Sequence, residues 1–407
     1  MNGARTRGHP AALAAVGAMI RGAAPGAVLL VGPAGIGKTT LALDLAAGLL
    51  CDAADPAARP DGACRACRLV AHGSHPDVRR IGPEGPGRQV VIGGPGKPRG
   101  IRDLIAELAL LPVEGGARVA IIEAAHRMNE DAQAALLKTL EEPPARTTII
   151  LCADAEEPLL PTIRSRCARI RLGPVTVRDL ESILTEVGAA DAPLGARLAR
   201  IADGRPGLAL AWARQPDALR ERDALGRALL DLAAARPADR LRGIGAIAAQ
   251  AISLNSVTEE VSGAQAAAEN GGAPRTRRGK TAVPRSPAAE TPTEDGVTDD
   301  SESEDEPATA VRAPATERRR AAEAVLLLWT DVTRDLALCQ RGLERSVRDV
   351  ARLDETQALA SDLDPDAVGA FLDRLGRATV LLATNVSPEL VLDDLALAWP
   401  RPRHLAA

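Results

Sequence analysis

The chain has 407 residues, 46% of them hydrophobic, a length that allows two or three domains with a core each. It contains three Trp, one Phe and no Tyr, which argues against proteins that stack bases on aromatic side chains. Fifty Lys and Arg face 54 Asp and Glu, so a net charge of −4 gives no overall attraction to nucleic acid or anionic lipid. The longest uncharged stretch, about 22–37, is interrupted by Pro and Gly, and no membrane span is expected.

The first part of the chain has the pattern of a parallel α/β sheet. Residues 11–20 predict a short Ala-rich helix rather than a secretion signal, because Arg21 interrupts the run. From Ala27 to Leu172, short aliphatic runs alternate with helical stretches. Helices are expected at 39–50, at 101–111 before Pro112, and after an N-cap at Asn129. Strands are expected at 27–31, 118–122, 147–151 and near Ile170.

Beyond Pro174 the strands cease and the pattern is helical. We expect a small helical domain over 174–232 and an all-helical C-terminal domain formed by 233–253 and 317–407. The intervening residues 254–316 are poor in large apolar side chains, so they cannot offset their ordering entropy and are predicted to be a disordered linker. Its basic and acidic clusters are expected to be solvated.

A complete P-loop motif follows the first strand. Backbone N–H groups of such a Gly-rich turn cradle phosphates, Lys38 reaches the terminal ones, and the Thr39 hydroxyl can ligate Mg²⁺. The motif therefore predicts that the chain binds ATP with Mg²⁺. The predicted nucleotide-binding residues are Gly32, Pro33, Ala34, Gly35, Ile36, Gly37, Lys38, Thr39, Thr40 and Glu123.

The strand 118–122 ends in Glu123, where a Walker-B acid would hold Mg²⁺ through water. The next residue is Ala124, where an ATPase usually carries the carboxylate that polarises the attacking water. General-base help is worth roughly a hundredfold to ten-thousandfold in rate. We therefore expect poor turnover, with His126 either substituting as a base or lying in the turn after the strand.

Several motifs together resemble one family. The run 136–144, Leu-Leu-Lys-Thr-Leu-Glu-Glu-Pro-Pro, and the Ser165-Arg166-Cys167 segment resemble bacterial clamp-loader subunits of DNA polymerase III. Gly8-His9 and the run 383–390 resemble the start of the AAA+ fold and the last collar helix of that family. The resemblance implies an AAA+ P-loop domain over 1–173, a helical lid over 174–232 and a C-terminal collar. It also implies a cytoplasmic replication protein.

Two departures favour the delta-prime type over the motor type, gamma or tau. A motor has Asp-Glu at the Walker-B end, where this chain has Glu123-Ala124, and a lid Arg that senses the γ-phosphate, where this chain has Gly207. The resemblance implies a stator in a hetero-pentamer with gamma or tau and delta, which loads the sliding clamp on primed DNA. The alternative is a motor subunit that hydrolyses ATP itself.

The resemblance assigns two further sites. Arg166 corresponds to an arginine finger that reaches the γ-phosphate held by a neighbouring subunit. Without the resemblance, the simpler interpretation is that Arg166 forms a structural ion pair with a nearby carboxylate. Family members also carry a four-cysteine zinc module after the P-loop helix, here 51–67. Three cysteines are in place, and a carboxylate occupies the remaining position. The module either holds Zn²⁺, with this carboxylate or water as fourth ligand, or is degenerate and empty. The predicted metal ligands are Cys51, Asp61, Cys64 and Cys67.

Overall fold

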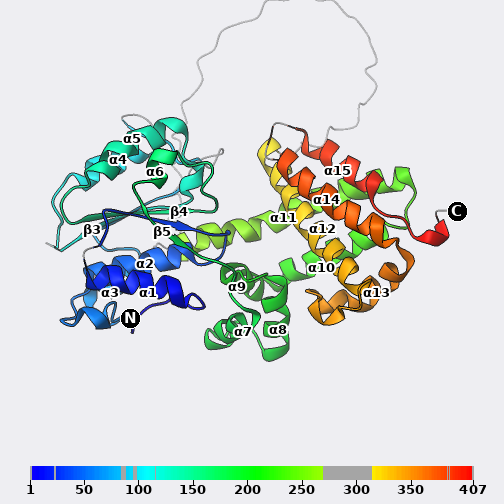
Figure 1. The fold of residues 1–407 in the computed structure, drawn as a ribbon, viewed down its shortest axis with the longest axis horizontal. Helices are drawn as coiled ribbons and strands as arrows, with labels where there is room; N and C mark the ends of the chain where they lie inside the picture. The colour runs from blue at the N-terminus through cyan, green and yellow to red at the C-terminus, as the bar shows by residue number, and fades with distance from the viewer. Residues whose placement is uncertain are drawn as a thin grey trace, which may run out of the picture.

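The structure is a computed structural model that describes residues 2–22, 24–83, 89–94, 99–114, 116–268, 314–382, 384 and 386–405. An α/β domain, a small helical lid and a larger helical collar follow one another along its long axis (Figure 1). In the described residues no helix is both long and apolar enough to cross a bilayer.

The α/β domain is built on a five-stranded sheet with the order β2-β3-β4-β1-β5. Every pairing in it is parallel, and β1 lies between β4 and β5. Apolar runs without alternation explain this arrangement, because the central strands are covered on both faces. The strands are β1 (Ala27–Val31), β2 (Val78–Ile81), β3 (Arg118–Ile122), β4 (Thr147–Ala153) and β5 (Ala168–Arg171).

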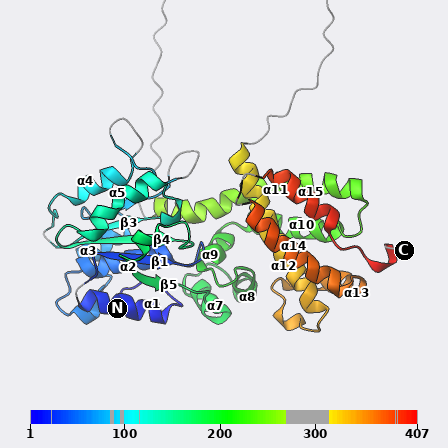
Figure 2. The ribbon, with the colours of Figure 1, turned by 45° about the horizontal axis from the view of Figure 1, so that its top comes forward.

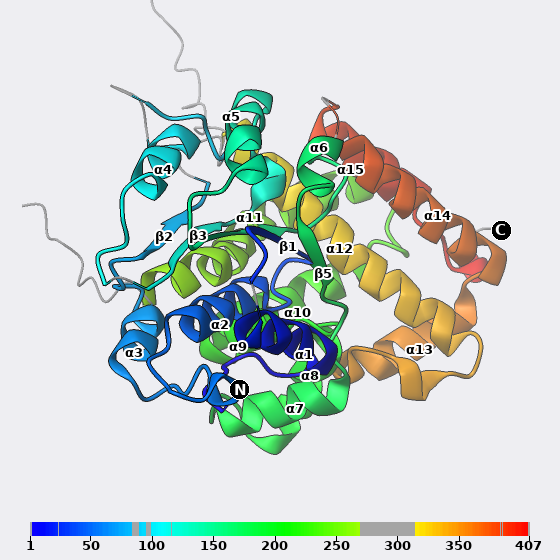
Figure 3. The same cartoon turned by 60° about the vertical axis from the view of Figure 1, so that its left-hand side comes forward.

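Helices cover both faces of the sheet (Figure 3). One buried cluster joins the sheet to α1, α2 and α3, and a second joins its other face to α4, α5 and α6. Asn129 caps α5 as predicted, since its side-chain oxygen accepts a hydrogen bond from the Ala132 N–H at 2.9 Å. The helices are α1 (Pro10–Arg21), α2 (Lys38–Leu50), α3 (Arg65–Ala71), α4 (Ile101–Leu108), α5 (Glu130–Glu141) and α6 (Pro161–Arg164).

The lid and the collar are entirely helical over their described residues. The lid core comes from α7, α8, α9 and the start of α10, whereas the second half of α10 packs in the collar core. Three of the four aromatic side chains of the protein meet in the collar, where the Phe371 and Trp399 ring centroids are 4.7 Å apart and Trp329 lies 5.4 Å from each. The helices are α7 (Val177–Glu186), α8 (Ala192–Ile201), α9 (Pro206–Arg214), α10 (Pro216–Asp231), α11 (Pro237–Ala268), α12 (Ala315–Cys339), α13 (Leu353–Asp362), α14 (Pro365–Leu382) and α15 (Pro388–Ala398).

Ion pairs join the lid to the collar at a place we call the lid–collar junction. The buried Asp349 of the collar accepts hydrogen bonds from Arg222 of α10 at 2.8 Å and from Arg197 of α8 at 3.2 Å. The neighbouring Arg348 donates to Asp203 of the lid at 2.5 Å. The lid helices lie between the α/β domain and the collar (Figure 2), and these ion pairs join the lid to the collar.

The structure differs from the sequence-based expectations at three places. First, the strand β2 was not predicted. Second, α4 ends at Leu108 rather than at 111. The chain turns away there because the guanidinium of Arg118 binds the carbonyl oxygens of Leu110 and Leu111 at 2.6 and 2.5 Å, which leaves Leu111 88% exposed. The linker was predicted to begin at 254, but α11 continues to Ala268, since Ala and Glu favour helix and no proline interrupts it. Residues 269–313, with both charge clusters, lie outside the described residues.

Candidate nucleotide site

The P-loop connects β1 to α2 at the carboxyl edge of the sheet, as the sequence predicts. Gly35 and Gly37 have φ values of 77° and 105°, which favour glycine. A Cβ at Gly37 would meet no atom within 4 Å, so glycine is needed there for the backbone conformation rather than for space. Nε2 of the buried His9 lies 3.0 Å from the carbonyl oxygen of Ile36, which fixes the loop. The start of α2, with its unpaired N–H groups, thus provides an anion site.

Lys38 begins α2 directly after this loop and is almost fully buried. Its ammonium donates to the carbonyl oxygens of Gly32 at 2.6 Å and Pro33 at 2.8 Å, and to Oδ1 of Asp154 at 2.7 Å. Asp154 directly follows β4, next to β1 in the sheet. The residues that follow Lys38, Thr39 and Thr40, lie half-buried in the first turn of α2.

The Walker-B carboxylate has a partner within the chain. Oε1 of Glu123 accepts hydrogen bonds from Nε of Arg80 at 2.9 Å and from its Nη2 at 2.6 Å. Both side chains are largely buried, with exposed fractions of 17% and 13%. The P-loop backbone and Lys38 fit a nucleotide phosphate well. The site fits Mg²⁺ less well, because Glu123, the acid expected to hold the ion, is neutralised by Arg80.

The position for the second Walker-B carboxylate is Ala124, whose φ of 47° is left-handed. His126 lies in the short 3₁₀ turn Ala125–Arg127 after β3, in agreement with the structural reading of this residue. Its Nδ1 accepts the Asp154 backbone N–H at 3.1 Å, so the ring proton is on Nε2, which lies 3.6 Å from Oδ2 of Asp154. Burial lowers the pKa of His126, so the ring is neutral and its lone pair is occupied.

The lid touches the P-loop through backbone atoms. The N–H of Gly207, near the start of α9, donates to the carbonyl oxygen of Gly35 at 2.8 Å. No side chain extends from this position toward the phosphates. The nearby Arg205 donates from Nε to the Ala202 carbonyl oxygen at 3.0 Å. Thus the lid covers the loop without contributing the sensor arginine of a motor subunit.

Arg166 lies at the surface just after α6. Its Nη1 donates to the Thr162 carbonyl oxygen at 2.9 Å, and its Nη2 pairs with Oε1 of Glu141 at 2.5 Å. Glu141 ends α5, within the run 136–144. In this structure of one chain Arg166 therefore has a local carboxylate partner, and both side chains are partly exposed.

The four predicted metal ligands come together. One ligand atom from each lies within 4.8 Å of all the others. The sulfurs of Cys51 and Cys64 are 3.9 Å apart, close to the edge of about 3.8 Å that Zn–S bonds of 2.3 Å give in a tetrahedron. Oδ1 of Asp61 accepts the N–H groups of Ala63 and Cys64 at 2.9 and 3.0 Å, which orients the carboxylate toward the sulfurs. Burial raises the pKa of the Cys67 thiol, so a metal would displace a proton from it. The donor set fits zinc.

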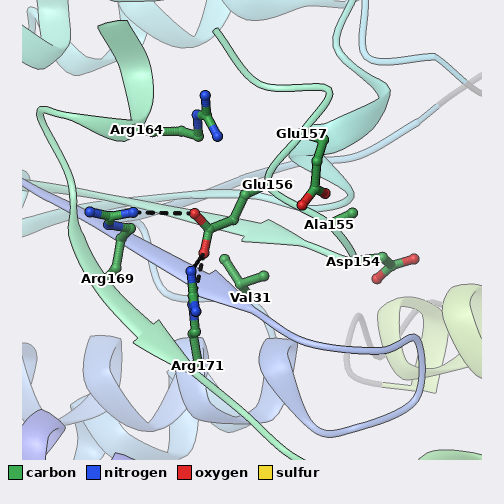
Figure 4. A pocket seen from close by; sticks show the side chains of 8 residues that line it. All are labelled: Val31, Asp154, Ala155, Glu156, Glu157, Arg164, Arg169 and Arg171. Carbon is green, nitrogen blue, oxygen red and sulfur yellow. Dashed lines mark hydrogen bonds and ion pairs between the residues drawn. The ribbon is translucent and has the colours of Figure 1, made fainter. Parts of the chain in front are cut away.

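A cavity of about 470 Å³ opens beside the P-loop at the same edge of the sheet (Figure 4). Glu156 is buried in its wall and binds Arg169 at 3.3 Å and Arg171 at 3.0 Å. Burial alone would raise the pKa of Glu156, but hydrogen bonds from these arginines hold it below its usual range. The cavity is lined by Val31, Asp154, Ala155, Glu156, Glu157, Arg164, Arg169 and Arg171.

Two residues of the site were not predicted from sequence. Asp154 directly follows β4 as Glu123 follows β3, but the strand predicted here ended at Leu151, three residues before Asp154; with the observed end, the rule that carboxyl ends of parallel strands meet at one edge identifies it. Arg80 gave no comparable signal. It lies on β2, a four-residue strand in which two of the residues are arginines.

The sheet order, the P-loop after β1 and the helical lid against it are the features of the AAA+ P-loop fold. Residues 14–176 match the family model described as DNA polymerase III, delta subunit. A delta-prime subunit of DNA polymerase III from Pseudomonas aeruginosa is 42% identical over 35% of this chain and 42% of its own length. The delta-prime subunit of Escherichia coli is 37% identical over 50% of this chain and 58% of its own length. In these residues the chain thus resembles the clamp-loader AAA+ family, and within it the delta-prime subunits.

The aligned part spans about half the length of these two relatives. The tau subunit of Salmonella typhimurium is 35% identical over 44% of this chain and 27% of its own length. A Thermotoga maritima structure described as a gamma subunit-related protein aligns over 97% of this chain and 99% of its own, at 16% identity. Its TM-score of 0.38 is too low to compare the two domain arrangements.

Proposed function

We propose that this chain is the delta-prime subunit of a DNA polymerase III clamp loader, an AAA+ stator that holds a nucleotide and does not hydrolyse it appreciably. Its partners would be gamma or tau, delta, the sliding clamp and primed DNA. The observation that carries the proposal is a complete P-loop beside an incomplete hydrolytic apparatus. Ala124 has no carboxylate, and Glu123 is paired with Arg80 at 2.6 Å.

The nucleotide role belongs to residues 32–40, with Lys38 as the cation for the terminal phosphate. Mg²⁺, where bound, would supply charge neutralisation at the phosphates, and the Thr39 hydroxyl is the side chain placed to hold it. No step of hydrolysis is assigned to this chain. The motor alternative would require a carboxylate that polarises the attacking water. Position 124, where this carboxylate is expected, is an alanine.

The stator role is supported by the lid–collar junction. Asp349 contacts Arg197 and Arg222 in a buried setting, so the lid and the collar have little freedom to rotate against each other. A subunit with these contacts would transmit force as one piece. In this proposal Arg166 leaves Glu141 when a neighbouring subunit docks, and it stabilises the phosphate charge in that neighbour's site.

We assign Zn²⁺ to Cys51, Asp61, Cys64 and Cys67, with a structural role. A structural site is closed by four protein ligands, and this cluster supplies four. The bound ion would tie the end of α2 to the start of α3.

The test combines assembly with turnover. The chain is purified with candidate gamma or tau and delta subunits of the same source, and ATPase is measured for the isolated chain and for the complex with primed DNA. We expect co-purification and no turnover by the isolated chain. The Arg166→Ala variant should still assemble with its partners. It should lower the DNA-stimulated ATPase rate of the complex by as much as about 10³-fold or more, which is what an arginine finger contributes. Arg178→Ala, an exposed arginine on α7, is the matched control.

Turnover by the isolated chain at the rate of the complex would favour the motor alternative. Failure to co-purify with any loader subunit would contradict the clamp-loader role. An unchanged ATPase of the Arg166→Ala complex would refute the arginine finger and leave the local pair with Glu141 as the role of this residue.

A further inference from the structure

The P-loop holds a fixed negative charge next to its lysine. Oδ1 of Asp154 lies 2.7 Å from Nζ of Lys38, within the range of a charge-assisted hydrogen bond. The backbone of Asp154 is held by His126, whose Nδ1 accepts the Asp154 N–H at 3.1 Å, and the Nε2 of the same ring lies 3.6 Å from Oδ2. Asp154 is thus anchored through both its backbone and its side chain.

This position matters for the length of a bound phosphate chain. The lysine of a P-loop reaches the terminal phosphates of a nucleotide, so oxygens of the third phosphate would share the ammonium with Oδ1 of Asp154. Two anionic groups would then lie within contact distance of each other. A diphosphate ends one group earlier, so Lys38 could bind its last phosphate and Asp154 together.

Nearby cations give this repulsion little relief, because in the adjacent cavity, which Asp154 also lines, Arg169 and Arg171 are bound to Glu156. The neutral ring of His126 adds no positive charge, and the sensor arginine of a motor is replaced by Gly207. Glu123 is engaged by Arg80, so the chain holds Mg²⁺ less firmly beside a third phosphate. Each of these features removes a compensating cation that a triphosphate would need.

We propose that this P-loop selects a nucleoside diphosphate over a triphosphate, and that Asp154 is the residue that sets the preference. The inference rests on the nucleotide binding proposed above and deepens it. The subunit would then hold ADP as a resident structural ligand within its assembly. The nucleotide that fills the site would not report the ATP cycle of the motor subunits.

The test measures equilibrium binding of fluorescent ADP and of a fluorescent non-hydrolysable ATP analogue, each with Mg²⁺ and with EDTA. We expect the wild-type chain to bind the diphosphate about tenfold more tightly or better, the order expected for one like charge at close range in a partly exposed site. Asp154→Asn keeps the shape and removes the charge, so it should tighten triphosphate binding by about tenfold and change diphosphate binding much less. Glu157→Gln, the same change of charge on an exposed neighbour in the same loop, should leave the ratio unaltered.

The outcomes separate the two proposals. Equal or tighter binding of the triphosphate by the wild type, or an unchanged ratio in Asp154→Asn, overturns the inference while nucleotide binding stands. Weaker Mg²⁺-dependent triphosphate binding by Asp154→Asn also overturns it, because Asp154 would then be a magnesium ligand. No saturable binding of either nucleotide, with Lys38→Ala indistinguishable from wild type, refutes nucleotide binding itself.

Discussion

The lid–collar junction offers a sharp test of how this structure is stabilised. Asp349→Asn removes one negative charge from a carboxylate that is 1% exposed and keeps its shape. That carboxylate serves three arginines, with Arg222 at 2.8 Å, Arg352 at 3.1 Å and Arg197 at 3.2 Å. Burial would raise the pKa of Asp349, but these arginines hold it below its usual range. The carboxylate is therefore ionised at neutral pH.

Removing one partner of a buried ion pair typically costs about 3–5 kcal/mol, because the remaining charge stays buried. Arg197 also pairs with Asp223 at 2.5 Å and Arg222 also approaches Asp331 at 3.5 Å, so part of the positive charge keeps a partner. We therefore expect a loss near the lower limit, about 3 kcal/mol in the free energy of unfolding. Since most domains are stable by only about 5–15 kcal/mol, this loss is large.

The assay is chemical denaturation of the full chain, followed by circular dichroism and Trp fluorescence. Trp212 of the lid lies under the guanidinium of Arg222 at 5.3 Å and reports the junction. Because a depressed carboxyl pKa contributes stability above its unfolded value, the difference should be the same at pH 7 and pH 5 and shrink only below about pH 4. Asp394→Asn, in an exposed pair with Arg374, is the control and should cost less than about 1 kcal/mol. A loss of under 1 kcal/mol for Asp349→Asn would refute the reasoning.

Two further predictions concern packing and the metal cluster. Gly226→Ala in α10 should destabilise the chain, although alanine favours helix, because the added Cβ would overlap the guanidinium of Arg352. At Gly376 in α14 an added Cβ meets nothing within 4 Å, so Gly376→Ala should stabilise the chain by up to about 1 kcal/mol in the same denaturation assay. Metal analysis should find about one zinc per chain, as a closed four-ligand site predicts, and Asp61→Ala should reduce zinc retention against a competing chelator. The exposed carboxylate of Asp52 in the same module is the control, and equal zinc loss from Asp52→Ala, or a metal-free wild type, would contradict the assignment.

The fold was predictable where local pattern and burial agree. β1 and β3 begin and end at the expected residues, because β1 is an unbroken aliphatic run, β3 is one after Arg118, and both are covered on both faces. β2 escaped prediction because Arg79 and Arg80 interrupt its apolar pattern, and it pairs only with β3 at the edge of the sheet. The end of α4 was missed for another reason. It depends on Arg118 at the start of β3, whose guanidinium binds carbonyl oxygens at the end of the helix and in the turn after it, and helical periodicity gives no sign of such a contact.

The candidate site divides along the same line. The glycines of the P-loop follow from motif spacing and the four ligands of the metal cluster from the family resemblance, and the structure brings the four ligands together. The partners of the charged residues do not follow from spacing. Nothing near Lys38 in the chain points to Asp154, 116 residues away, and nothing near Glu123 points to Arg80. Such pairs are set by the sheet order, which places the carboxyl ends of β2, β3, β4 and β1 side by side.

The departures of this chain from a hydrolytic P-loop site are distributed over several positions. The expected base is Ala124, the Walker-B acid is bound to Arg80, and the lid supplies Gly207 in place of an arginine. General-base help alone is worth about 10² to 10⁴ in rate, and groups that act on one transferred phosphate contribute non-additively. A carboxylate restored at position 124 would therefore act on a phosphate that no sensor arginine holds, in a loop whose lysine still binds Asp154. The proposed role, a subunit that holds nucleotide without cycling, would account for a binding loop that is complete while the groups around it are replaced or already paired.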